Sequence, residues 1–391
     1  MGRKRKILAV TGIRSEYDIL YPIIDCLRKN DKFDLKLAVS GAHLTQWHGH
    51  TVDRIRKDGF NIIDTIHTLL MDNTGLQRAK GTGLLITGLS ETVKRFNPDI
   101  LLVVGDREES IAVAVVGTYM NTLIAHMGGG DAVYGNSDDP IRFAVSKLAH
   151  VHLVSSNVSA LNLQKTGEED FRIFNVGNPA FDNIRLTPQL SLKRISKFLG
   201  VDIEAKPYIV LIHHPLSSVY QDAGRQMEIL LKGVSHFCRE NGYQCIGIHP
   251  NTDPGALDIL RVINTYDNDP QIRFFKTLPR DIFVNMMRHT KALIGNSSMG
   301  LLEAPYYQLP VVNVGDRQKG RLNAGNVVFV DYDPVLIIKA LKRACADAEY
   351  RRKIKLLENP FGDGHSAQRI QKILASIDLE DKNWYIKRGV S

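Results

Sequence analysis

Short apolar runs alternate with helical patterns along almost the whole of this 391-residue chain. In the first half, strands are predicted at residues 7–11, 35–40, 61–66, 100–105, 123–126, 151–154 and 173–176. After a polar helical stretch at 191–199 the alternation begins again, with strands predicted at 208–212, 244–248, 272–275, 292–295, 311–314 and 327–330. Strands that alternate with helices predict an α/β fold with a doubly wound parallel sheet in each half.

The change of pattern after residues 177–179 marks a domain boundary. A chain of this length exceeds the range in which one core keeps growing, so two domains are expected on size alone. We predict Rossmann-like domains at 1–185 and 186–365, and a helix or tail at 366–391 that packs back on the first domain. Two such domains facing across a cleft form the glycosyltransferase-B architecture, in which ligands bind outside the carboxyl ends of the strands.

Composition narrows the class of protein without defining a function. Hydrophobic residues make up 43% and charged residues 24% of the chain, as in ordinary globular proteins. The apolar runs have strand length, so no membrane span is expected, and basic residues 2–6 lead into a strand rather than a secretion signal. The positive residues behind the net charge of +8 are scattered, which argues against nucleic acid and suits an anionic small substrate.

The cysteines show no paired CxxC spacing and fall in segments that read as helix or strand; they are Cys26, Cys238, Cys245 and Cys345. This usage predicts a reducing compartment, and hence a cytoplasmic protein without structural zinc.

Polar residues follow the first and fourth predicted strands. The segment 12–18 lacks the GxGxxG spacing that wraps a dinucleotide pyrophosphate, so a nicotinamide cofactor is not expected. Arg14 and Asp18 in this segment are candidate substrate-binding residues, although an arginine here can also be a solvated loop residue. Asp106 and Arg107 follow the fourth strand, where Asp106 could cap a helix, face the substrate, or do both.

The densest group of titratable residues follows the fifth strand. His126 precedes three glycines, which allow close backbone approach to a ligand, and Asp131, Asp138 and Arg142 come shortly afterwards. A helix beginning in this segment explains part of the pattern. If adjacent strand ends converge, the group lies near Asp106, and neighbouring carboxylates can supply one acid and one base. We predict the reaction centre here.

Three strands of the second half also end in polar segments, which contain His214, Asn251, Ser297 and Ser298. The free N–H groups of the segment 295–300 can hold a diphosphate at the start of the next helix, or the serines can simply cap that helix. Glu303 could accept hydrogen bonds from ribose hydroxyls, and Arg317 could neutralise phosphate. No HExxH, DxD or clustered ligand spacing occurs, so neither a metal nor another cofactor is expected.

In chain order, these motifs resemble the UDP-N-acetylglucosamine 2-epimerase family, and in particular its hydrolysing branch. The resemblance covers nearly the whole chain; its segments are Arg14 with Tyr17, then 105–107, 126–142, 214–215, 250–251, 294–298 and 315–318. It implies a UDP-sugar substrate, from which UDP is eliminated to give a 2-acetamidoglucal that is hydrated to the manno sugar. Carboxylates suit this proton traffic, because a matched acid and base serve both half-reactions.

The resemblance also assigns residues. It implies that UDP is held by Arg14, His214, Asn251, Leu278, Ser297, Ser298, Glu303 and Arg317. It places Arg107 near the diphosphate and makes Asp106 and Asp138 catalytic. We add Asp131 and His214 to the catalytic candidates, and Asp18, His126 and Arg142 to the substrate-binding candidates.

One position departs from the family. Many members have a glutamate two residues after the strand-end histidine, where this chain has Gly128, and Asp131 is the nearest substitute. A reshaped pocket could accept either N-acetylglucosamine or a 2,4-diacetamido-6-deoxy sugar. A non-hydrolysing 2-epimerase, a glycosyltransferase and a non-catalytic UDP-sugar sensor are the alternative functions. A homo-oligomer, dimer or tetramer, is expected.

Overall fold

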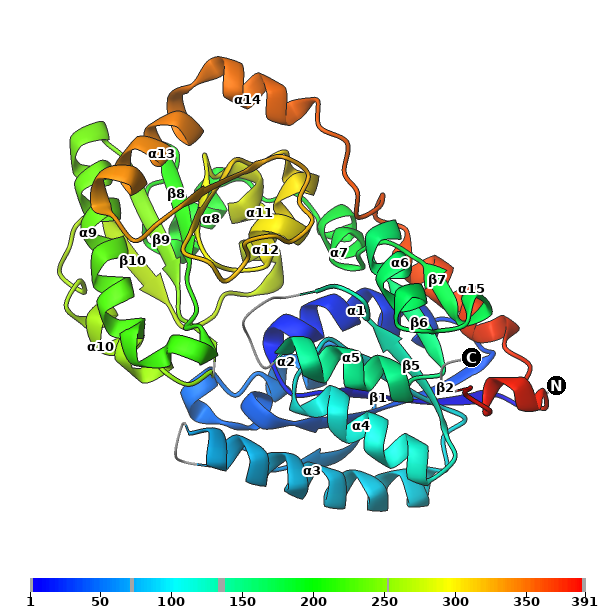
Figure 1. The fold of residues 1–391 in the computed structure, drawn as a ribbon. Helices are drawn as coiled ribbons and strands as arrows, with labels where there is room; N and C mark the ends of the chain where they lie inside the picture. The colour runs from blue at the N-terminus through cyan, green and yellow to red at the C-terminus, as the bar shows by residue number, and fades with distance from the viewer. Residues whose placement is uncertain (1–2, 71–73, 133–137, 252, 389–391) are drawn as a thin grey trace. The chain divides into compact units, whose positions relative to one another are not determined.

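The computed structural model describes residues 3–70, 74–132, 138–251 and 253–388, which divide into two compact units (Figure 1). The first unit is built from the described residues up to Arg185 together with those from Phe361 onward. The second is built on Leu186–Pro360. The predicted tail, residues 366–391, therefore contributes its described residues to the first unit.

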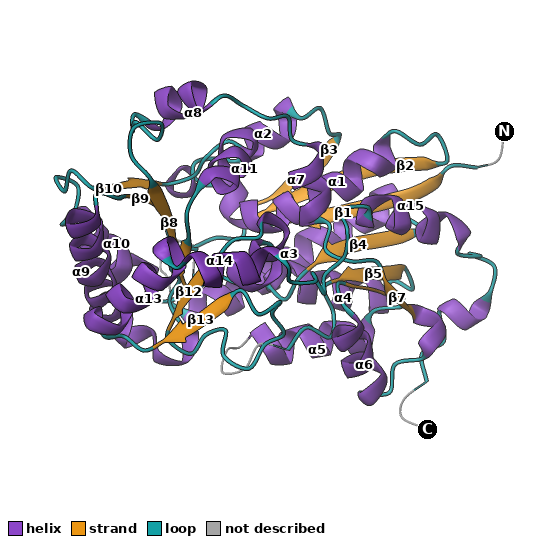
Figure 2. Ribbon diagram, turned by 90° about the horizontal axis from the view of Figure 1, so that it is seen from above, coloured by secondary structure: helices purple, strands orange, loops and turns teal. Residues whose placement is uncertain are grey.

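The first unit contains a seven-stranded sheet with the order β3-β2-β1-β4-β5-β6-β7, in which all neighbouring strands are parallel. The strands are β1 (Arg5–Thr11), β2 (Phe33–Ser40), β3 (Ile62–Ile66), β4 (Ile100–Val104), β5 (Leu123–Met127), β6 (Val151–Val154) and β7 (Ile173–Asn175). Figure 2 shows β2, β1, β4, β5 and β7 following one another across this sheet. The order reverses between β1 and β4, which is the topological switch point where ligands of doubly wound folds bind.

Helices cover both faces of this sheet: α1 (Arg14–Arg28), α2 (Val52–Lys57), α3 (Gly75–Phe96), α4 (Glu108–Tyr119), α5 (Asp138–Leu148), α6 (Asn157–Lys165), α7 (Ala180–Leu186) and α15 (Ser366–Ser376). Short 3-10 turns lie at Gly41–Leu44, Gln46–His48, Asp170–Arg172 and Lys382–Trp384. Alternate residues of β4 enter two different cores. Leu102 packs with Leu20 of α1 and Ile370 of α15, whereas Leu101 packs with Leu89 of α3. A strand buried on both faces must be apolar throughout, which explains the unbroken run at 100–104.

The second unit contains a parallel six-stranded sheet with the order β10-β9-β8-β11-β12-β13. Its strands are β8 (Tyr208–Ile212), β9 (Gln244–Ile248), β10 (Ile272–Phe275), β11 (Leu293–Gly295), β12 (Val311–Val314) and β13 (Val327–Val330). Its helices are α8 (Leu192–Leu199), α9 (Ala223–Asn241), α10 (Ala256–Asn264), α11 (Arg280–His289), α12 (Met299–Leu302), α13 (Pro334–Ala346) and α14 (Ala348–Lys355), with 3-10 turns at Ser217–Asp222 and Ala304–Tyr307. The order reverses between β8 and β11.

The α/β class and the thirteen predicted strands are confirmed, each strand beginning and ending within two residues of its prediction. The chain returns to the first unit through backbone contacts, because Phe361 accepts a hydrogen bond from the Asn178 N–H at 2.7 Å. Asp182 then accepts the N–H groups of Ser366 and Ala367 at the start of α15, at 2.9 and 3.2 Å. Within the described ranges, no helix is long and apolar enough to cross a membrane.

Candidate functional site

An ion pair between Asp106 and Arg142 is the centre of the candidate site in the first unit. Asp106 follows β4, and Arg142 lies on α5 with only 7% of its surface exposed. The other guanidinium nitrogen of Arg142 donates to the carbonyl oxygen of Gly128 at 2.6 Å. Arg142 thereby joins the ends of β4 and β5, and we expect it to orient the Asp106 carboxylate. The predicted convergence of Asp106 and Arg142 is confirmed.

The backbone explains why residue 128 is a glycine. Gly128 has φ +89°, a left-handed conformation that side-chain-bearing residues rarely adopt. Gly105, which precedes Asp106, has φ +86°, and its N–H donates to the carbonyl of Met127 at 2.9 Å. Both turns occur where parallel strands end at one edge of the sheet, which lets a ligand approach the backbone closely.

His126, a predicted substrate-binding residue, is buried at the end of β5. The imidazole is fully buried, and its Nε2 lies 2.7 Å from the carbonyl oxygen of Gly105, while Nδ1 lies 3.4 Å from Ser146 Oγ. Burial lowers the pKa of His126 to about 3, so the ring is neutral at physiological pH and Nε2–H donates to Gly105. His126 therefore supports the turn before Asp106, and its substrate-binding role stays a prediction.

The other predicted residues of the first unit take varied positions. Arg14 is the first residue of α1 and lies 4.0 Å from the carboxylate of Asp18, which pairs with Arg54 at 2.8 Å. Arg107 occupies the N-cap position of α4 without capping the helix through its side chain, and Asp106 directly precedes it. Asp131 is half-buried in the segment after β5.

Asp138 is the first residue of α5, but its side chain lies outside the described part of the structure. Its candidate catalytic role, like that of Asp131, stays a prediction.

Two buried glutamates at the same sheet edge are not among the site residues predicted from the sequence. Glu16 on α1 is 7% exposed, and Glu109 on α4 is 5% exposed and accepts a hydrogen bond from Ser40 at 3.0 Å. Burial and the neighbouring charge of Glu109 raise the pKa of Glu16 well above its ordinary value. Burial and Glu108 likewise raise the pKa of Glu109. A glutamate in the first turn of a helix ordinarily interacts favourably with the helix dipole, so the sequence gives no sign that either residue is buried.

The candidate site in the second unit is organised by Asn296, which directly follows β11. Asn296 is 1% exposed, and its side chain accepts the N–H of His214 at 2.7 Å and donates to the His214 carbonyl at 2.8 Å. His214 Nδ1 in turn accepts the N–H of Asn251 at 3.1 Å. Three strand ends, those of β8, β9 and β11, are thus connected, as the sequence predicts for their polar residues.

Arg317 joins this group from the loop after β12. Its guanidinium donates to the carbonyl of Asn296 at 3.2 Å, beside Gln318, which donates to the same oxygen at 3.0 Å. The Nε atom of Arg317 is buried, and it has no hydrogen-bond partner among the described residues. A buried donor of this kind is costly unless a ligand satisfies it, which supports an anion site here.

The remaining predicted residues of this unit lie close by in sequence. Ser297 Oγ lies 3.4 Å from the N–H of Met299, and Ser298 is the N-cap of α12 without capping it through its side chain. Helix α12 ends at Leu302, and Glu303 is its C-cap residue. Leu278 is 1% exposed, and its side chain packs in the core of this unit.

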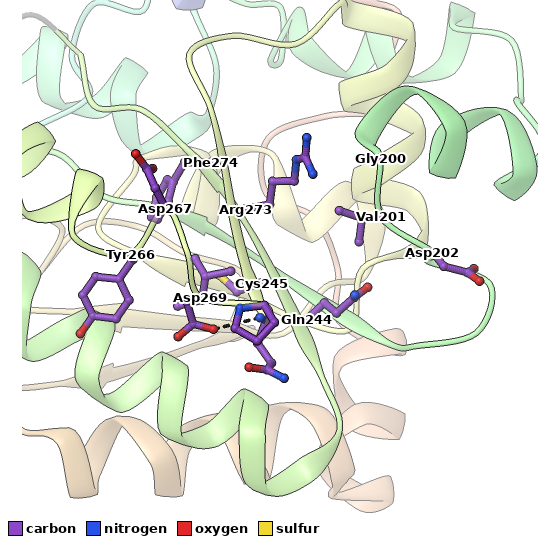
Figure 3. A pocket seen from close by; sticks show the side chains of 13 residues that line it. Gly200, Val201, Asp202, Gln244, Cys245, Tyr266, Asp267, Asp269, Arg273 and Phe274 are labelled. Atoms are coloured by element: carbon purple, nitrogen blue, oxygen red, sulfur yellow. Dashed lines mark hydrogen bonds between the residues drawn. The ribbon is translucent and has the colours of Figure 1, made fainter.

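A pocket of about 480 Å³ lies elsewhere on the second unit (Figure 3). Its lining includes Gln244 and Ile272, the first residues of β9 and β10, with Asp269 and Arg273 beside them. It therefore opens at the amino ends of these strands, away from His214 and Asn296. Among the described residues, no group of three or more His, Cys, Asp or Glu side chains could hold a metal ion.

Polar residues gathered at the carboxyl ends of two parallel sheets define a two-unit α/β protein of the kind that binds ligands at its strand ends. Residues 25–375 match the family described as UDP-N-acetylglucosamine 2-epimerase. The chain belongs to this family.

Two relatives share a substrate class. The chain is 33% identical to the Legionella pneumophila UDP-N,N'-diacetylbacillosamine 2-epimerase (hydrolyzing), over 97% of both chains. It is 31% identical to the Campylobacter jejuni GDP/UDP-N,N'-diacetylbacillosamine 2-epimerase (hydrolyzing), over 83% of this chain and 84% of that one. A Neisseria meningitidis UDP-GlcNAc 2-epimerase bound to UDP-GlcNAc has the same fold, with a TM-score of 0.80, 19% identity and coverage of 94% and 99% of the two chains.

Proposed function

We propose that this protein is a hydrolysing UDP-sugar 2-epimerase. It eliminates UDP from a UDP-2-acetamido sugar to give a 2-acetamidoglucal, and then adds water to give the free manno sugar. The observation that carries the proposal is the pairing of Asp106 with Arg142 where the strands end, in a chain 33% identical to a hydrolysing enzyme over 97% of its length. A non-hydrolysing epimerase or a glycosyltransferase is not favoured by these relatives.

In this proposal the second unit holds UDP. His214, Asn251 and the backbone around Ser297 and Ser298 contact the nucleotide, and Arg317 satisfies its buried Nε against the diphosphate. Glu303 binds the ribose hydroxyls. A guanidinium is suited to this role because it stays charged and presents several donors to one phosphate.

The first unit acts on the sugar. Asp106, oriented by Arg142, accepts the proton from carbon 2 while the bond between carbon 1 and the diphosphate oxygen breaks. Arg14 and Arg107 lie at the same sheet edge and stabilise the negative charge that develops on the leaving group. Asp131 and Asp138 are further candidates for proton transfer.

The preferred sugar in this proposal is the 2,4-diacetamido-6-deoxy compound, since both hydrolysing relatives at 31% identity or more are named for diacetylbacillosamine. The left-handed backbone at Gly128 supports a sugar pocket of altered shape, since a side chain there would be strained. The product would then be a precursor of legionaminic-acid-like sugars rather than N-acetylmannosamine for sialic acid. The cysteines of the structure are free thiols, which supports a cytoplasmic location.

The test is a proton NMR time course in deuterated water with UDP-N-acetylglucosamine and, separately, its 2,4-diacetamido-6-deoxy analogue. We expect free UDP and a manno sugar carrying deuterium at carbon 2, formed faster from the analogue. A UDP-sugar product without free UDP would indicate the non-hydrolysing reaction. Tight UDP binding without turnover of either compound would indicate a transferase or a sensor.

A further inference from the structure

Glu16 and Glu109, here called the buried carboxyl pair, lie where β1, β2 and β4 end. The carboxylate of Glu109 fills the space beside two glycines: a Cβ atom added to Gly12 would come within 1.7 Å of Glu109 Oε1, and one added to Gly41 within 3.0 Å. Glu16 Oε1 lies 3.7 Å from the position of a Cβ at Gly105, the residue that precedes Asp106. The pair is therefore packed directly behind the candidate reaction centre.

The surroundings of the pair do not neutralise it. Glu16 Oε1 is buried and has no hydrogen-bond partner among the described residues, and Glu109 accepts a hydrogen bond from Ser40. Arg107 and the carboxylates of Asp106 and Glu108 face the pair from the β4–α4 segment, but Glu108 pairs with Arg78 and also approaches Arg107. Asp18, on the same helix as Glu16, pairs with both Arg14 and Arg54.

Two carboxyl groups in such surroundings reduce stability if they are ionised, because each is desolvated and each repels the other. Burial raises the pKa of both groups, with Glu109 adding to the rise at Glu16 and Glu108 to the rise at Glu109, so each group holds its proton to a higher pH than a surface glutamate does. Burial raises the pKa of Asp182 as well, but this carboxylate makes structural hydrogen bonds, since it accepts two backbone N–H groups at the start of α15. Groups that lower stability without making a structural bond are typical of functional sites.

We propose that the buried carboxyl pair holds a proton at neutral pH and stores it for the reaction, acting through Asp106, which Arg142 holds as the ionised partner. This inference rests on the proposed function, which needs an ionised and a protonated carboxyl at the same pH. A site can supply an ionised and a protonated carboxyl at one pH when the environments of the two groups move their pKa values apart. Glu16 and Glu109 are positioning residues in this scheme.

Protons are conserved over the elimination and hydration steps. In the elimination, Asp106 takes the proton from carbon 2, and the electron pair of the carbon–oxygen bond leaves with UDP. In the hydration, a separate acid of the proposed site protonates the other face of carbon 2, and the oxygen of water bonds to carbon 1. The proton left by water restores this acid, and the proton on Asp106 passes to the pair as the stored proton leaves to solvent with UDP, so that Asp106 is ionised for the next turnover.

The test compares Glu16→Gln and Glu109→Gln with the matched control Asp182→Asn. Glutamine keeps the shape and removes an ionisable group, so we expect both glutamine variants to unfold at higher urea concentration than wild type. Because a raised pKa makes the folded state lose stability as pH rises above the ordinary glutamate value, this gain should grow between about pH 5 and pH 8. Asp182→Asn should instead unfold at lower urea concentration and keep its kcat.

Two further readouts separate the outcomes. The infrared band of a protonated carboxyl should be present at neutral pH in wild type and absent in Glu16→Gln. In the same variant, kcat should fall by about a hundredfold with an unchanged Kd for UDP, and the pH profile of kcat should lose one ionisation. Retained kcat, a missing band in wild type, or destabilisation like that of Asp182→Asn would each overturn the proposal. A wild type that shows the band but releases no UDP from either substrate would instead overturn the proposed function, and the storage role with it.

Discussion

The two sheets present different chemistry at equivalent edges. In the first unit, the strand ends carry buried charge: Arg142 is 7% exposed, Glu16 is 7% exposed and Glu109 is 5% exposed. In the second unit, the strand ends are connected by neutral groups, with the amide of Asn296 hydrogen-bonded to both backbone groups of His214 and Arg317 added from one side. Groups that can gain or lose protons suit a reaction, whereas hydrogen-bond donors with set directions suit the recognition of a ligand that does not change. The comparison therefore supports our proposal that the first unit carries out catalysis and the second binds the nucleotide.

The largest effect is expected from Arg142→Met, which removes the cation beside Asp106 and the donor to Gly128 while retaining an apolar stem. We expect kcat to fall on the order of 10²- to 10³-fold, because an unoriented and uncompensated carboxylate is a poor base. The Kd for UDP should stay within about twofold, since the nucleotide is held elsewhere. Steady-state kinetics with UDP titration by calorimetry checks both numbers.

The matched control is Arg95→Met, which removes an exposed ion pair of the same unit, formed with Asp64. It should leave kcat and Kd close to wild type, since exposed pairs contribute about 1 kcal/mol or less. Arg142→Lys retains the charge but cannot reach Asp106 and Gly128 with the same fork. If Arg142→Met weakened UDP binding as much as it slowed turnover, the two units would not divide their roles as proposed.

The difference between the units also explains what the sequence could predict. The strands were predictable because runs such as 100–104 are apolar on both faces, and the polar residues at strand ends followed from the parallel order. The burial of Glu16 and Glu109 was not predictable, because a glutamate in the first turn of a helix is ordinarily solvated. Their burial follows from tertiary packing, such as that of Gly12 and Gly41 against the carboxylate of Glu109. The hydrogen bond from the His126 ring to a backbone carbonyl was not predictable either, since the residues in contact with a side chain do not follow from the sequence pattern.

A smaller effect is expected from Asn296→Ala in the second unit. The change removes both hydrogen bonds to His214 and lets the strand end of β8 move relative to β11. We expect the Kd for UDP to rise about tenfold, equivalent to about 1.4 kcal/mol, with a small change in kcat at saturating substrate. Calorimetric titration of UDP measures the first quantity, and the NMR assay at high substrate measures the second.

Asn285→Ala provides the control for lost stability. Asn285 is as deeply buried, in helix α11, and its amide bonds the backbone groups of Pro188, Asp281 and Leu190. Both variants should unfold at lower urea concentration, but only Asn296→Ala should bind UDP more weakly. Equal losses of affinity in the two variants would show that general loosening of the unit, and not the strand-end amide, controls the nucleotide site.

The smallest effect is expected from Lys387→Met. This variant tests whether the end of the chain stabilises the candidate reaction centre of the first unit. Lys387 Nζ donates to the carbonyls of Ser146 and Ala149 at the end of α5, at 2.9 and 2.6 Å, and to Glu168 at 2.6 Å. Since α5 carries Arg142, we expect unfolding free energy to fall by about 1–3 kcal/mol and kcat by a few-fold, with unchanged UDP affinity. Exposed Lys382→Met in the same tail should change none of these.

The pH dependence of this loss distinguishes a specific ion pair from general packing. Burial would raise the pKa of Glu168, but hydrogen bonds from His152 and Lys387 lower it to about 2. A depressed carboxyl pKa stabilises the folded state above the ordinary glutamate value and stops doing so as pH falls toward the folded value. The difference in urea midpoint between wild type and Lys387→Met should therefore be largest near pH 7 and shrink between about pH 5 and pH 3. A difference that stays constant over this range would mean that Lys387 stabilises the fold through its apolar stem. Charged groups would then matter in the first unit only at the strand ends.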